Sequence, residues 1–135
     1  MGRVWSTGNA NWLRPMYDEL IQLAQTEFDD IVARTETIGR RAGVALKLRF
    51  HLIDATIVDV WLSPDLNRYS YHWEQRAVRG VLHRHDNAPD HPDVATFPKH
   101  FHNESEDVIE ASYIPDEPEQ ALRFFLTFVR NRLSA

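Results

Sequence analysis

A period-two alternation of apolar and polar residues constrains the middle of this 135-residue chain more than any other feature. It is clearest in residues 45–52 and 68–75, while residues 57–62 are rich in β-forming side chains. Such alternation puts one kind of side chain on each face of a β-strand. After a reversal, residues 81–86 supply a fourth segment. Because the connections are short, we expect an antiparallel β-meander over residues 44–86.

Helical spacing brackets this meander. In residues 12–38 apolar side chains recur every three or four positions, and Gly39 can end that helix. A second apolar stripe runs through residues 116–134, and a short edge strand is expected at residues 107–113. The fold prediction is one α+β domain over residues 1–135. It has a long N-terminal helix, an antiparallel β-meander of four to five strands, and a C-terminal helix packed on one face of the sheet.

Composition excludes several classes of protein. The chain has no cysteine, which excludes disulfides, thiolate metal sites and cysteine nucleophiles. A hydrophobic share of 43% supports a packed core and excludes a disordered polar chain. No run approaches the roughly 20 apolar residues that span a bilayer, and the first residues lack a signal-peptide pattern. We therefore expect a cytoplasmic protein with no membrane partner.

Charge is unevenly distributed, although the net charge is −5. Residues 38–84 hold 8 basic and 4 acidic side chains, whereas residues 85–120 hold 1 basic and 10 acidic. The basic middle could face a phosphate backbone. It could equally be a solvated sheet face whose charges are balanced by the acidic segment.

Histidine and proline concentrate in residues 87–106, which we expect to form a loop. Six of the seven histidines lie between His72 and His102. The prolines of this segment exclude a helix or a central strand. Structureless loops of this length are usually functional or disordered.

The histidines and an arginine of this region suit metal-free RNA cleavage. Attack of a ribose 2′-OH on the adjacent phosphate needs a base, an acid and a cation for the developing charge. Imidazole titrates near neutrality, and guanidinium matches phosphate oxygens. We predict that His100 and His102, or alternatively His72, transfer protons and that Arg84 holds the phosphate. His72 and Arg84 share a face only if their strands pair in the right register.

Four further residues are predicted to bind the substrate: Asp86, Asn87, His91 and Trp73. The Trp73 ring could stack on an unpaired base, although packing in the core would also explain an aromatic residue there. Asp86 and Asn87 could instead end the strand and aim the loop, because both side chains accept hydrogen bonds from nearby backbone.

A metal-dependent hydrolase is the alternative chemistry. His83 and His85 lie two apart on a predicted strand, so their imidazoles project from the same face. With His91, or alternatively His72 or Asp86, as a third ligand they could hold a divalent metal such as Zn and leave a position open for water. No HExxH-type motif is present. The prediction is therefore no cofactor, with a divalent metal as the alternative.

The same residues resemble the signature of TumE-type toxins of bacterial toxin–antitoxin systems. The similarity covers residues 71–102 and rests on Tyr71-His72-Trp73, Leu82, Arg84, Asp86-Asn87-Ala88-Pro89-x-His91-Pro92, Thr96-Phe97-Pro98-x-His100 and His102. The resemblance implies an RNA-targeting toxin that is partnered by a small helix-turn-helix antitoxin. Asp90 and Lys99 depart from the pattern, because we expect additional histidines at both positions.

Two classes of function stay open. The first is the toxin of a type II toxin–antitoxin system that acts as an endoribonuclease. The second is a non-catalytic binding domain whose His/Pro-rich loop docks a protein partner. An exposed strand edge could also support a homodimer.

Overall fold

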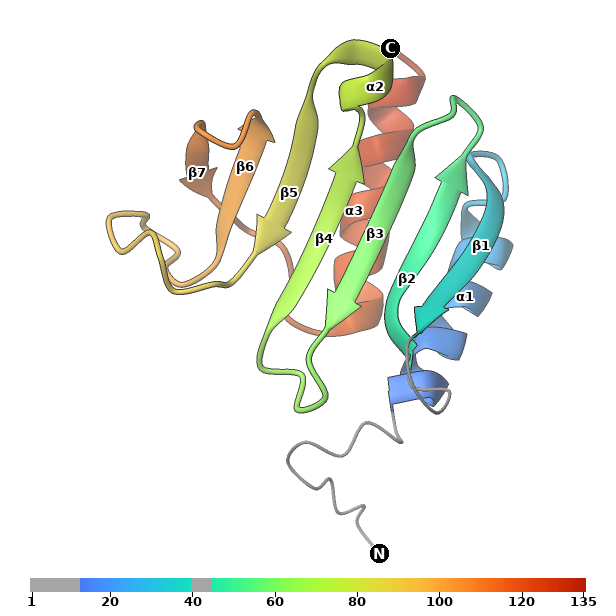
Figure 1. Cartoon of the computed structure of the whole chain (residues 1–135), viewed down its shortest axis with the longest axis horizontal. Coiled ribbons are helices and arrows are strands. Elements are labelled where there is room, and N and C mark those ends of the chain that lie inside the picture. The colour runs from blue at the N-terminus through green and yellow to red at the C-terminus, as the bar shows by residue number, and fades with distance from the viewer. Residues whose placement is uncertain (1–12, 40–44) are drawn as a thin grey trace, which may run out of the picture.

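Seven strands form one antiparallel sheet, in which each strand pairs with the next along the chain (Figure 1). The computed structural model describes residues 13–39 and 45–135. The strands are β1 (Val32–Gly39), β2 (Ala45–Leu52), β3 (Ile57–Leu62), β4 (Tyr69–Glu74), β5 (Leu82–Asp86), β6 (His100–Glu104) and β7 (Ile109–Ala111). The helices are α1 (Leu13–Glu27), the single turn α2 (Arg76–Arg79) and α3 (Pro118–Leu133).

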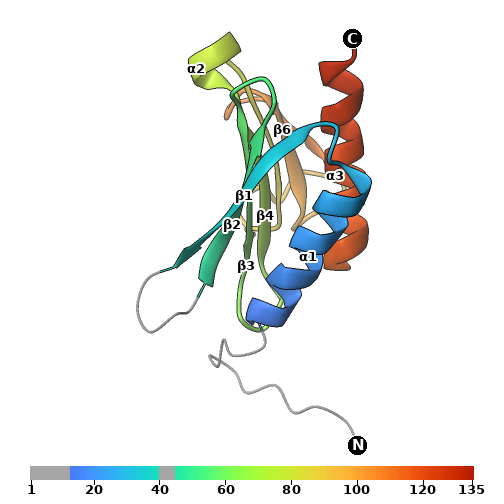
Figure 2. The same cartoon turned by 90° about the vertical axis from the view of Figure 1, so that its right-hand side faces the viewer.

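Helices α1 and α3 cover the same face of the sheet (Figure 2). The core lies between these layers and is filled by alternate strand residues and by the apolar stripes of the helices, among them Leu48, Phe50, Val58, Val60, Tyr71, Leu20, Leu122, Phe125 and Val129. The Tyr17 hydroxyl of α1 accepts a hydrogen bond of 3.1 Å from the Leu62 amide, which ties the helix to the sheet. No helix in the described part of the chain is long and apolar enough to cross a membrane.

The opposite side of the sheet carries no helix of comparable length among the described residues, and we call it the open face. It is formed by the strand side chains that point away from α1 and α3, including Arg49, His51, Asp59, His72, Arg84, Asp86, His100 and His102. The predicted packing of the C-terminal helix on one face is thus confirmed.

The helix expected over residues 12–38 is wrong in its second half. Helix α1 ends at Glu27, and the chain turns before β1 begins at Val32. Phe28 and Ile31 continue the helical spacing of apolar residues and are buried, yet they do so from a turn. The β-branched side chains that follow favour an extended chain, and their backbone groups pair with β2.

The strand count of four to five is also too low, because the sheet has seven strands. Strands β2 to β5 account for the meander expected over residues 44–86. The two segments that the sequence assigned elsewhere are β1, expected as helix, and β6, expected as loop. The edge strand expected at residues 107–113 is present as β7.

Candidate active site

The register of the sheet brings several of the predicted site residues onto one surface. His72 pairs with Arg84, Arg84 with His102, and Asp86 with His100. Directly opposed residues point to the same face of a sheet, so all five side chains lie on the open face. His72 and Arg84 are in the register that the prediction required, with 3.4 Å between His72 Nδ1 and Arg84 Nη1.

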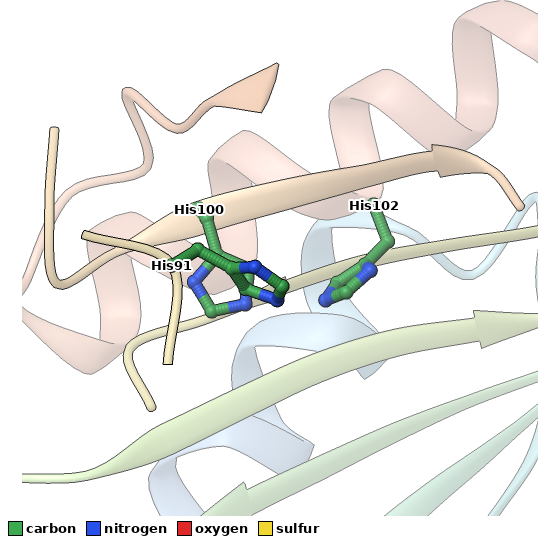
Figure 3. A group of neighbouring side chains, drawn as sticks. All are labelled: His91, His100 and His102. Carbon is green, nitrogen blue, oxygen red and sulfur yellow. The ribbon is translucent and has the colours of Figure 1, made fainter. Parts of the chain in front are cut away.

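Asp86, His91, His100 and His102 form a group that we call the open-face cluster. Asp86 ends β5, the two histidines of β6 stand beside it, and His91 comes from the loop over residues 87–99. The three imidazoles turn toward one another (Figure 3), and one nitrogen of each lies within 4.8 Å of the others. Asp86 Oδ1 lies 3.1 Å from His100 Nε2, and Asp86 Oδ2 lies 3.6 Å from His102 Nε2.

Backbone carbonyls orient the two imidazoles of β6. His100 Nδ1 lies 3.0 Å from the Pro98 carbonyl, and His102 Nδ1 lies 3.1 Å from the Glu106 carbonyl. A carbonyl oxygen only accepts, so each Nδ1 carries a hydrogen and each Nε2 faces the cluster. The His100 and His102 side chains are 1% and 5% exposed, whereas that of His91 is 34% exposed. His91 is therefore the imidazole that solvent reaches.

Arg84 links the cluster to an exposed carboxylate. Its Nε donates to Asp86 Oδ2 at 2.9 Å, and its two terminal nitrogens donate to Glu106 at 2.6 and 3.1 Å. Burial raises the pKa of the Asp86 carboxyl, but its contacts with His102, Arg84 and the Ala88 amide together lower that pKa by more. The net pKa lies well below the usual range, so Asp86 is ionised at neutral pH.

His72 lies beside the cluster and is tied to a second ion pair. Its Nε2 lies 3.0 Å from Glu74 Oε1, and Glu74 also accepts hydrogen bonds from the Arg76 guanidinium. The Arg76 contact holds the pKa of Glu74 at about 2. Burial lowers the pKa of His72 more than Glu74 raises it. A neutral His72 can accept from Arg84 at Nδ1.

Asn87 anchors the loop that carries His91. Its Oδ1 accepts from the Tyr69 amide at 3.0 Å, and its Nδ2 donates to the Asn67 carbonyl at 2.7 Å. Asp86 Oδ1 accepts from the Ala88 amide at 3.0 Å. Asn87, which the sequence assigned to substrate binding, thus fastens the loop to the β3–β4 turn.

His83 and His85 lie on the helix-covered face and are not brought together with His91. They are 2% and 5% exposed, and both rings stack on Phe101. Gln75 Nε2 donates to His83 Nδ1 at 2.8 Å. Burial lowers the pKa of His83 to about 4 and that of His85 to about 3. The alternative metal grouping of these two residues with His91 is not assembled, because the sheet lies between them.

Trp73 is a core residue and does not reach a substrate. It is 1% exposed, and its indole Nε1 donates to the Thr56 hydroxyl at 2.8 Å. Trp61 is an aromatic residue on the open face, where it is 40% exposed and lies opposite Ser70. Sequence reasoning missed it, although alternation with the buried Val60 and Leu62 was the signal that could have placed it outward.

A shallow hollow of about 420 Å³ opens beside the cluster and is lined by Trp61, Arg68, Ser70, Arg84, Asp86, His91, His102 and Glu106, among others. Glu106 was also missed by sequence reasoning, because it lies in an acidic run with no motif. The hollow joins the exposed edge of the cluster to an aromatic ring and two guanidinium groups, and it is the part of the open face where a ligand could contact all three.

The described basic residues of the middle segment are largely paired with acids. Arg49 makes two hydrogen bonds to Asp59, at 2.8 and 2.9 Å, and Lys47 lies 3.1 Å from the same carboxylate. The open face is thus a balanced polar surface rather than a uniformly basic one. Arg40 and Arg41, which contributed to the predicted basic charge, lie outside the described residues.

These features define a small α+β protein with a histidine and aspartate centre on the uncovered face of its sheet. A family model described as Toxin TumE matches residues 18–133, and the chain belongs to this family. The match contains the whole open-face cluster and supports a toxin role. Neither the curated proteins nor the solved structures returned a match.

Proposed function

We propose that this chain is the toxin of a type II toxin–antitoxin pair, that it acts in the cytoplasm, and that it cleaves RNA at the open-face cluster. The observation that carries the proposal is the placement of three imidazoles and the Asp86 carboxylate beside the Arg84 guanidinium, at the rim of an open hollow. Of these groups, the exposed His91 can carry a proton to or from the substrate, and Arg84 supplies the cation that phosphodiester cleavage needs.

The proposed reaction is attack of a ribose 2′-oxygen on the adjacent phosphorus. His91 takes the 2′-OH proton as the 2′-oxygen bonds to phosphorus, the bond from phosphorus to the 5′-oxygen breaks, and the departing oxygen takes its proton from water in the open hollow, to which His91 later releases the proton that it took. His91 is the imidazole exposed enough to contact the reacting oxygens. His100 and His102 are too buried to do so, and their Nε2 atoms lie against the Asp86 carboxylate. Metal-free proton transfer, which the sequence favours, stays a prediction.

Single-stranded RNA is the substrate class that suits the hollow. The exposed Trp61 ring can stack on an unpaired base. Arg84 can hold the scissile phosphate once the phosphate replaces Glu106 on its terminal nitrogens. Arg68, exposed at the rim, can contact a neighbouring phosphate.

A small helix-turn-helix antitoxin is the proposed partner. Residues 85–120 carry 10 acidic and 1 basic side chain, so this half of the chain suits a basic partner surface. Co-expression of the antitoxin gene with the toxin gene tests this pairing, because a true antitoxin restores growth and purifies with the toxin.

Induced expression in a bacterial host tests the toxic activity. Wild type, His91→Ala and the double variant His100→Gln/His102→Gln are compared for growth arrest and for fragmentation of total RNA. His51→Ala is the matched control, because His51 lies on the same face but pairs with Glu36, outside the cluster. We expect arrest with RNA loss in wild type and control only. Arrest by all four proteins, or arrest without RNA loss, would favour a non-catalytic binding domain.

A further inference from the structure

We infer that His91, His100 and His102, together with Asp86, form a binding site for one divalent transition-metal ion of the zinc class. The site differs from the grouping of His83, His85 and His91 that sequence spacing suggested. It does not depend on the proposed RNA cleavage, because metal binding is measured without RNA.

The first argument is the geometry of the donor atoms. A tetrahedral zinc site with bonds of about 2.0–2.1 Å places its nitrogens about 3.3 Å apart. One nitrogen from each imidazole already lies within 4.8 Å of the other two. The ring centroids are 4.6 Å apart for His91 and His100, 4.9 Å for His100 and His102, and 5.8 Å for His91 and His102. Metal binding therefore requires the three nitrogens to move closer together, and His91 is the ligand that stands in the loop rather than on a strand.

The second argument is the direction of the ligand atoms around Asp86. The Nδ1 atoms of His100 and His102 are occupied by backbone carbonyls, so their Nε2 atoms are the donors that face the cluster. These Nε2 atoms lie 3.1 and 3.6 Å from the two carboxylate oxygens of Asp86. One divalent cation placed among them can be bound by both imidazoles and the carboxylate.

The third argument is the support behind the ligands. Metal-binding histidines usually donate their other ring nitrogen to a carbonyl or carboxylate, which fixes the ring and the tautomer. His100 and His102 do this with the Pro98 and Glu106 carbonyls. Asp86 is held in turn by Arg84 Nε at 2.9 Å. Three of the four donors therefore stand on paired strands, and only His91 has to be delivered by the loop.

The donor set indicates the class of ion. Three imidazoles and one carboxylate suit Zn²⁺ and neighbouring transition metals, whereas Mg²⁺ and Ca²⁺ require mainly oxygen ligands. His91 borders the hollow that contains Arg84, so the bound ion would lie at the edge of that hollow. Four protein donors fill a tetrahedral ion, so a catalytic role would require one donor to leave or a fifth ligand to bind, and His91 would then be a ligand rather than a proton carrier.

Metal titration of the purified, tag-free full chain at one pH near neutrality tests the site. Co²⁺ binding is followed by its visible absorption and Zn²⁺ binding by calorimetry. We expect one equivalent per chain and tetrahedral Co²⁺ bands. His91→Ala and His102→Gln should each weaken binding by at least tenfold, and His51→Ala should bind like wild type. Zn²⁺ should raise the melting temperature of wild type and His51→Ala more than that of His91→Ala.

His91→Ala keeps the test independent of folding, because that side chain is half-buried in a surface loop and stands on no strand. Absence of saturable binding at one equivalent would overturn the site, as would unchanged binding in both cluster variants. A variant that no longer binds Zn²⁺ but still fragments RNA would support the metal site and contradict a catalytic role for the bound ion. Wild type that binds Zn²⁺ but never fragments RNA would contradict the proposed function alone.

Discussion

Asp86 and His100 face each other across neighbouring strands, with 3.1 Å between the carboxylate Oδ1 and the imidazole Nε2. The register of β5 and β6 pairs these two residues directly. Because both groups stand on paired strands, backbone hydrogen bonds rather than a loop set their separation. This rigid pair is the base of the open-face cluster, to which the loop adds His91.

Asp86→Asn should abolish growth arrest and weaken Zn²⁺ binding by at least tenfold. The substitution keeps the shape of the side chain and can keep the bond from the Ala88 amide. It removes the negative charge toward which both β6 imidazoles and Arg84 are turned. Growth assays and metal titrations measure the two effects, with circular dichroism to verify the fold.

Asp59→Asn is the matched control for that substitution. Asp59 is also a half-buried carboxylate of the open face, but its partners are Arg49 and Lys47 rather than the histidines. We expect Asp59→Asn to keep toxicity and metal binding. Full toxicity of Asp86→Asn would remove the cluster from the mechanism.

Glu106→Gln should strengthen RNA binding by roughly three- to tenfold, about 0.7–1.4 kcal/mol. Glu106 occupies the two terminal nitrogens of Arg84 that a phosphate would use. Neutralising it removes a competing anion and a repulsive charge. Fluorescence polarisation with a 2′-O-methyl single-stranded RNA, which lacks the attacking hydroxyl, measures binding without cleavage.

Arg84→Lys should weaken binding in the same assay. An ammonium group cannot make the paired contacts of the guanidinium plane, and Asp86 loses its partner at Nε. Equal affinities for wild type, Glu106→Gln and Arg84→Lys would show that Arg84 does not contact the phosphate.

The sequence was sufficient for the regular parts of the fold. Alternation identified β2 to β5, and the stripe of residues 116–134 identified α3. It failed between Phe28 and Ile38, because Phe28, Ile31 and Val32 are spaced like a helix face yet are buried from a turn and a strand. Spacing reports which residues are buried, and two different backbones can bury the same ones.

Several of the residues predicted for the site lie together in the structure, but their assembly could not be predicted. The prolines at residues 89–98 led to the prediction of a loop where β6 begins. The pairing of Asp86 with His100 could therefore not be predicted from the sequence. In β5, polar residues occupy both faces, and alternation could not tell that His83 points to the helices. Sequence shows which side chains share a face, whereas the packing of α3 decides which face is covered.

Stability should fall in acid because His83 is buried in its neutral form. Burial lowers its pKa from 6.5 to about 4 in the folded protein. Between these pH values the unfolded chain binds more protons, so the free energy of unfolding rises with pH. The contribution is complete above about pH 6.5, and about 3 kcal/mol of it is lost on acidification to about pH 4. Urea unfolding across this range measures the loss.

His83→Phe should reduce that pH dependence without abolishing it, because the buried His85, whose pKa burial lowers to about 3, still contributes. Phenylalanine can stack on Trp73 and Phe101 as the imidazole does but cannot take a proton. The variant leaves the Gln75 amide without its acceptor, which lowers stability by about 1 kcal/mol at every pH. An acid-induced loss in His83→Phe as large as that of wild type would contradict the assignment.

Trp73→Phe should lower stability by about 1–3 kcal/mol without weakening RNA binding. The substitution removes the buried hydrogen bond from the indole to the Thr56 hydroxyl and leaves a small void in the core. Trp73 lies under the helices and has no route to the hollow. Thermal unfolding and the polarisation assay separate the two effects.

Trp61→Ala should behave in the opposite way. Its ring is 40% exposed at the rim of the hollow, so its loss changes stability little, whereas loss of base stacking weakens RNA binding by about 1–3 kcal/mol. The two tryptophans therefore distinguish the two faces of the sheet: the variant on the covered face changes folding, and the variant on the open face changes binding. A binding loss in Trp73→Phe, with none in Trp61→Ala, would mean that the RNA contacts a different surface.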